Sequence, residues 1–99
     1  MKMVRAGLTT GLVLTSALSF AADEPPGASS CSGCHAVKSG VQTSVPPLNG
    51  RDAKEIATAM AEFRSGARTS TVMDRLAKGY TPEETQAIAA WLATQPQPN

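Results

Sequence analysis

The stretch Cys31-Ser32-Gly33-Cys34-His35 decides the fold of this 99-residue chain. It has the spacing C-x-x-C-H, which is the attachment signature of a c-type haem. Two thiols three positions apart on a short helical turn can each add to one vinyl group of the macrocycle. The next residue then places an imidazole nitrogen against the iron. We therefore predict that Cys31 and Cys34 attach one covalent haem c and that His35 is an axial iron ligand.

Three other roles of the same motif, namely a zinc site, a redox dithiol and a disulfide, agree less well with the rest of the sequence. The chain contains only two cysteines and one histidine, whereas a structural zinc site normally takes four nitrogen or sulfur ligands. A thioredoxin-like dithiol would accompany a βαβ pattern, and the sequence shows no strand alternation. A disulfide or reactive pair between Cys31 and Cys34 stays open as an alternative, although so small a loop would stabilise little.

The first 21 residues have the pattern of a secretory signal peptide. Lys2 and Arg5 precede an apolar run over 6–20, and small residues at Ser19 and Ala21 suit a cleavage site. A membrane anchor is the alternative, but the run is shorter than the roughly 20 apolar residues that span a bilayer. We expect cleavage near Ala21, a mature domain over 22–99, and no membrane attachment afterwards.

The expected mature domain is small and nearly neutral. Seven basic and eight acidic residues follow Ala21, so its formal net charge is −1, and nucleic acid is not an expected partner. The full chain has two Phe, one Trp and one Tyr, and one of the Phe, Phe20, falls in the signal segment, so the domain can build only a thin core. Domains of this size often need a metal, disulfide or other staple. A buried haem would supply that staple.

Helical patterns predict an all-α domain. A short helix over 26–35 would carry the haem motif. A second should run over 52–65, capped by Asp52 and stopped by Gly66, with an apolar stripe of Ile56, Ala59, Met60 and Phe63. A helical turn is expected near 72–77. The last helix should run over 82–94 behind a Thr81–Glu84 capping box, with Ile88, Trp91 and Leu92 on its apolar face and Ala87 beside them.

An electron carrier needs the second axial position filled, and no second histidine exists. A methionine thioether is the natural candidate, since Met/His ligation also raises the reduction potential. Met1 and Met3 fall in the signal segment and Met60 lies on an apolar stripe, where methionine usually fills gaps. Met73 follows a Thr/Ser run that could let its sulfur reach the haem. We predict Met73 as the ligand, with an ordinary core methionine as the alternative.

The segment Val45-Pro46-Pro47-Leu48 can act as a rigid loop beside the haem. A backbone carbonyl held here could accept a hydrogen bond from the other ring nitrogen of His35, which would fix its tautomer and orientation. The alternative is a simple surface turn. Pro46 is therefore a candidate residue of the haem site.

Taken together, these residues resemble the class I c-type cytochromes, from about Ala28 to Leu92. Pro46-Pro47-Leu48 resembles that family's proline loop, Met73 occupies its distal methionine position, and Trp91 matches an aromatic of its C-terminal helix. The resemblance implies a small helical domain wrapped around one covalent haem, attached in the bacterial periplasm. One departure is the lack of an aromatic just before Cys31, which leaves the contact between first and last helices in doubt.

A narrower resemblance covers Phe63–Arg68 and Val72–Thr81, which are similar to the haem subunit of flavocytochrome c sulfide dehydrogenases. It implies a non-catalytic subunit that accepts electrons from a sulfide-oxidising flavoprotein with FAD. A free-standing periplasmic shuttle that serves other redox proteins is the main alternative. A haem catalyst or gas sensor would need an open iron position. No side chain is expected to act as acid, base or nucleophile.

Overall fold

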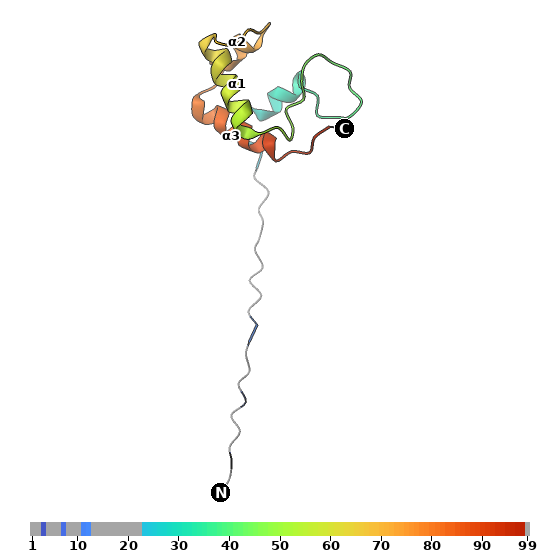
Figure 1. Ribbon diagram of the computed structural model, residues 1–99, viewed down its shortest axis with the longest axis vertical. Helices are drawn as coiled ribbons and strands as arrows, with labels where there is room; N and C mark the ends of the chain where they lie inside the picture. The colour runs from blue at the N-terminus through green and yellow to red at the C-terminus, as the bar shows by residue number, and fades with distance from the viewer. Residues whose placement is uncertain (1–2, 4–6, 8–10, 13–22, 99) are drawn as a thin grey trace.

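The computed structural model describes residues 3, 7, 11, 12 and 23–98 (Figure 1). Apart from those first four positions, the expected signal segment lies outside the described residues. Across the described part of the chain, no helix has the length and apolar character needed to cross a membrane. In residues 23–98 the regular elements are all helical, which confirms the all-α prediction. They are η1 (Ala28–Gly33), α1 (Ala53–Ser65), α2 (Met73–Leu76), η2 (Ala77–Gly79) and α3 (Pro82–Ala93), where η marks a 3-10 helix.

Helix α1 begins and ends where the sequence predicts. The side chain of Asp52 accepts a hydrogen bond of 3.0 Å from the backbone N–H of Glu55, which satisfies one of the free donors of the first turn. Gly66 ends the helix with φ 85°, a left-handed conformation that favours glycine. The predicted stripe faces inward, since Ile56 is buried and its three partners are half-buried.

Helix α3 has the complete capping box that the sequence indicates. Thr81 accepts from the Glu84 N–H, and the Glu84 carboxylate accepts from the Thr81 N–H. Ile88 and Leu92 are buried as predicted and Trp91 is half-buried.

The sequence prediction placed the wrong alanine beside this face. Ala87 is exposed, whereas Ala89 is only 1% exposed. The inward face of α3 continues through Thr85, which is half-buried. Positions 85, 88, 89 and 92 have the i, i+3, i+4, i+7 spacing of one helix face, so this face turns away from Ala87.

The helix that carries the haem motif also differs from expectation. It is a six-residue 3-10 helix rather than a ten-residue segment over 26–35. Gly27 precedes it with φ 88°, which is outside the right-handed helical region, so a helix cannot run through residues 26 and 27. Tight 3-10 turns are usual in short connecting pieces, and here one turn suffices to present the motif.

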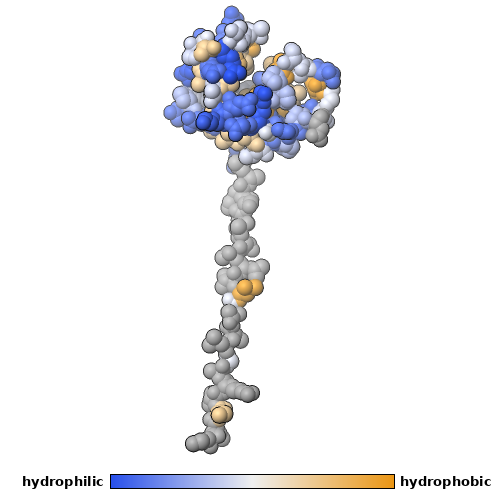
Figure 2. All heavy atoms as spheres, viewed as in Figure 1, coloured by the Kyte–Doolittle hydropathy of each residue, from blue (hydrophilic) through white to orange (hydrophobic). Residues whose placement is uncertain are grey.

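The core is small and lies between η1, α1 and α3. Its buried members are Ala28, Ile56, Ile88, Ala89 and Leu92. Because Ala28 and Ala89 are both small and almost fully buried, the start of η1 can approach α3 closely. The contact between the first and last helices, which the lack of an aromatic before Cys31 left in doubt, is present through Ala28 in the core cluster. Figure 2 shows a largely hydrophilic outer face on this helical part.

Candidate haem-attachment site

The motif forms a compact turn at the end of η1. The backbone N–H groups of Cys34 and His35 both donate to the carbonyl of Cys31, at 3.3 and 2.9 Å. The Ser32 hydroxyl donates to the Ser29 carbonyl at 2.7 Å. These local bonds keep both cysteines and the histidine on one turn of chain, as the attachment chemistry requires.

His35 is oriented by the proline loop. Its Nδ1 lies 2.5 Å from the backbone carbonyl of Pro46. A carbonyl can only accept, so Nδ1 carries the proton and Nε2 keeps a free lone pair. Metal-binding histidines commonly have their second nitrogen held in this way. The structure thus contains the hydrogen bond that we expected between the 45–48 segment and the ring of His35. The role of Pro46 in a haem site stays a prediction.

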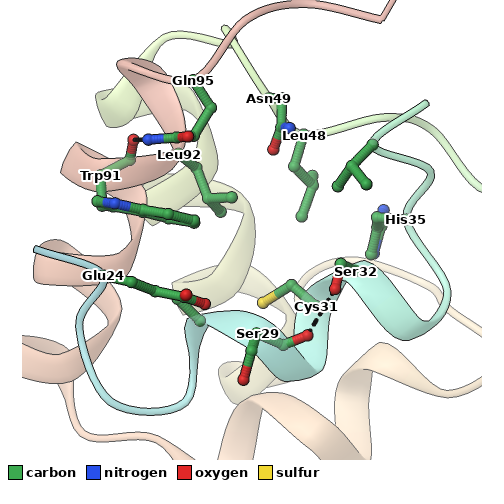
Figure 3. Close-up of a pocket in the computed structure, with 12 residues that line it drawn as sticks. Glu24, Ser29, Cys31, Ser32, His35, Leu48, Asn49, Trp91, Leu92 and Gln95 are labelled. Carbon is green, nitrogen blue, oxygen red and sulfur yellow. Dashed lines mark hydrogen bonds between the residues drawn. The ribbon is translucent and has the colours of Figure 1, made fainter. Parts of the chain in front are cut away.

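A cavity of about 320 Å³ opens beside this turn. Figure 3 shows Cys31 and His35 on one side of it, with Trp91 and Leu92 from α3 and Leu48 from the loop on the other. The cavity brings together one of the two predicted thiols, an imidazole, and an apolar wall of aromatic and aliphatic side chains, which fit one thioether, one iron ligand and the apolar surface of a haem. Cys34, the second predicted thiol, does not line this cavity.

The cavity also has a polar border that sequence reasoning missed. Its polar lining residues include Glu24, Asn49 and Gln95, which come from three separate parts of the chain. Nothing in their local sequence distinguishes them from ordinary surface residues, because only the fold brings them together.

Backbone contacts hold the loop wall of the cavity against α3. The Gly50 N–H donates to the Leu92 carbonyl at 2.9 Å, and the Gln97 side chain donates to the Gly50 carbonyl at 3.2 Å. Gly50 has φ 76°, and a Cβ at this position would collide with the Cγ of Gln97. The loop therefore passes between α3 and the C-terminal segment at a point where glycine fits best.

The two cysteines differ in their surroundings. Both thiols are free; Cys31 is half-buried and lines the cavity, whereas Cys34 is exposed and lines a neighbouring hollow with Val37 and Val41. Burial raises the pKa of the Cys31 thiol. A backbone hydrogen bond opposes this in part, and the Glu24 carboxylate adds a smaller increase. The Cys31 thiol of the haem-free chain is thus protonated at neutral pH.

Met73 does not lie among the residues that line this cavity. It is half-buried at the start of α2. The Ser70 hydroxyl accepts a hydrogen bond from the Asp74 N–H at 2.9 Å and donates to the Asp74 carboxylate at 3.2 Å, which fixes the turn that presents Met73. Met60 is also half-buried, on the stripe of α1. The assignment of Met73 over Met60 stays a prediction.

Comparison with known proteins finds two curated relatives. The chain is 41% identical over 70 residues to the cytochrome subunit of sulfide dehydrogenase from Chlorobaculum tepidum, covering 71% of this chain and 64% of the relative. It is 34% identical over 76 residues to a thiosulfate dehydrogenase electron acceptor from Stutzerimonas stutzeri, covering 75% of this chain and 35% of that protein. The matches span less than two thirds of either relative. No family model matches the chain. The relatives confirm the resemblance that the motif and the 63–81 segment indicate.

Proposed function

This chain is related to the cytochrome subunit of a sulfide dehydrogenase, and from that premise we propose that it transfers electrons in the periplasm through a single covalent haem c. Cys31 and Cys34 would hold the macrocycle, and His35 and Met73 would occupy the two axial positions. When bound, the haem supplies a one-electron iron couple. The single observation that carries the proposal is the His35–Pro46 hydrogen bond beside a cavity that Cys31 and apolar side chains line.

The residues of the chain have a supporting role in this function. Pro46 holds the imidazole so that Nε2 is available, and Leu48, Trp91 and Leu92 exclude water from one side of the site. Limited access of water and a fixed ligand geometry both help to set a reduction potential. No group in this arrangement needs to give or take a proton during electron transfer.

A redox titration followed by visible absorbance tests the proposal. We expect one transition with the slope of a one-electron couple, from one haem per chain. We also expect the reduced protein to bind carbon monoxide only slowly, since Met73 must first leave the iron. Rapid binding of carbon monoxide at full occupancy would instead favour a haem catalyst or gas sensor.

The favoured partner is a flavoprotein with FAD, as the resemblance of Phe63–Arg68 and Val72–Thr81 implies. The relative from Chlorobaculum tepidum, a subunit of sulfide dehydrogenase, supports a partner enzyme. A free-standing shuttle is the second candidate, supported by the relative described as an electron acceptor. Size-exclusion chromatography of the protein from its native source separates them. Coelution of flavin and haem absorbance would favour the subunit, and a haem peak at the mass of the monomer would favour the shuttle.

The surface around α2 suits contact with a redox partner. Val72 and Leu76 are 46% and 49% exposed, and no ion pair joins Arg75 or Lys78 to an acid within the described residues. The segment 62–80 carries four basic and two acidic residues, whereas the rest of 23–98 carries three basic and six acidic ones. A small apolar centre beside positive charge on an otherwise acidic domain fits a partner surface with acidic residues at its edge.

Oxidation by the hexacyanoferrate(III) anion tests whether electrons leave near α2. Reversing the charge in an Arg75→Glu, Lys78→Glu variant should slow the reaction several-fold at low salt, because the anion is no longer attracted. A Lys54→Glu, Arg51→Glu variant makes the same charge change at the other end of α1 and serves as the control. Equal slowing in both variants would contradict an exit near α2.

A further inference from the structure

Tyr80 connects three segments that are distant in the sequence. It follows η2, and its backbone carbonyl accepts a hydrogen bond of 2.5 Å from Arg64 of α1. Its hydroxyl lies 2.8 Å from the Ser30 hydroxyl of η1. Its half-buried ring packs against the core. One side chain thus contacts the haem-motif turn while its backbone is held to the helix that precedes Met73.

The direction of the hydroxyl contact follows from the neighbouring bonds. Ser30 has one hydroxyl hydrogen, and its oxygen lies 2.6 Å from the Gly27 carbonyl, which can only accept. Ser30 therefore donates to Gly27, and the Tyr80 hydroxyl donates to Ser30. Removing the Tyr80 hydroxyl would leave the Ser30–Gly27 bond in place, so the effect of the change is confined to the link between the two segments.

Gly27 lets the tyrosine ring approach η1. Gly27 has φ 88°, and a Cβ built on it would lie 3.0 Å from Cε1 of Tyr80. That distance is tighter than most real Cβ contacts, so a larger residue would require the ring to shift slightly. The close approach of Tyr80 to the haem-motif turn thus depends both on the tyrosine ring and on the absence of a side chain at Gly27.

The segment that precedes Tyr80 packs on α1 but is shallowly buried. In α2 and η2 only Ala77 is buried, and the neighbouring Val72 and Leu76 are about half exposed. Met73 lies seven positions before Tyr80, and Ser30 directly precedes Cys31. The Tyr80–Ser30 bond therefore joins the segment of the predicted sulfur ligand to the turn that carries the predicted nitrogen ligand.

We propose that Tyr80 is a positioning residue that keeps the Met73 segment at a fixed place relative to the haem-motif turn. The inference rests on the proposed haem ligation. Without the hydroxyl link, the α2–η2 segment would move away from η1 more often, and Met73 would leave the iron more readily. Loss of the hydroxyl link should therefore raise the rate of ligand exchange more than it lowers the overall stability of the fold.

The test is the rate at which added imidazole replaces Met73 on the ferric iron, followed by loss of the sulfur-to-iron charge-transfer band. Tyr80→Phe should speed the replacement about five-fold, the factor that corresponds to a hydrogen bond of about 1 kcal/mol. Ser30→Ala removes the same link together with the Ser30–Gly27 bond, so it should speed the replacement at least as much. Adding Tyr80→Phe to Ser30→Ala should change the rate little further.

Asp52→Ala is the matched control. It removes the N-cap of α1 and should lower the stability by an amount similar to the loss of one hydrogen bond, without touching Tyr80 or Ser30. Its exchange rate should stay that of the wild type. Equal acceleration in Asp52→Ala would show that lost stability alone explains the effect and would overturn the proposal.

Two further outcomes are distinguishable. A wild-type protein with the sulfur band whose Tyr80→Phe variant exchanges at the wild-type rate would overturn the positioning role alone. A wild-type haem protein without the band would overturn the Met73 ligation and the positioning role together.

Discussion

At the scale of single residues, one hydrogen bond orients His35, the predicted iron ligand. The Pro46 carbonyl leaves Nδ1 protonated and Nε2 free. Sequence reasoning could name both residues, because the spacing of the motif is local and a pair of prolines makes the backbone rigid. It could not find Asn49 or Gln95 at the cavity border, since their position depends on contacts between distant parts of the chain.

The assignment of Met73 gives a prediction at the same scale. Met73→His should retain the haem, because attachment depends on the cysteines, but lower the reduction potential by roughly 0.2 V, a fraction of the ~0.8 V that axial ligands span. Spectroelectrochemistry measures this directly. Met60→His is the control and should leave the potential near that of the wild type. An unchanged potential in Met73→His would show that Met73 does not bind the iron.

At the scale of elements, the helices of the second half were predictable and the haem-motif segment was not. The bounds of α1 and α3 follow from caps that lie within four residues of the ends they fix, such as Asp52 and Thr81. The 3-10 form of η1 and the burial of Ala89 in place of Ala87 depend on packing between η1 and α3. Local sequence patterns do not predict such contacts between distant segments.

Gly50 offers a test of the contact between the loop and α3. Gly50→Ala should lower the free energy of unfolding by about 2 kcal/mol, because a Cβ is strained at φ 76° and meets Gln97. Gly40 has a similar φ of 79° with open space around it, so Gly40→Ala should cost only about 1 kcal/mol. Urea denaturation of the haem protein measures both. Equal losses would show that the Gln97 contact does not matter.

At the scale of the whole molecule, the haem is expected to complete the core. The buried residues of the core are few and three of them are alanine, namely Ala28, Ala77 and Ala89. Within the described residues, no large side chain is fully buried. So small a core contributes little hydrophobic free energy compared with the entropy lost on folding.

The same chain produced without haem should therefore be poorly folded. We expect weak cooperativity in thermal unfolding and a poorly dispersed NMR spectrum, whereas the haem protein should give a dispersed spectrum and a sharp transition. The two samples share one sequence, so only the haem differs. A well-dispersed spectrum from the haem-free chain would show that the polypeptide alone completes its core.

Covalent attachment through both cysteines is the central claim, and mass spectrometry of the denatured protein tests it most directly. The chain should be exported in a bacterium that matures c-type cytochromes, then unfolded in acid and weighed. We expect the mass of the mature polypeptide plus one haem, lowered to the bare polypeptide when Cys31 and Cys34 are both replaced by alanine. The mass of the bare polypeptide from the wild-type chain would contradict the account.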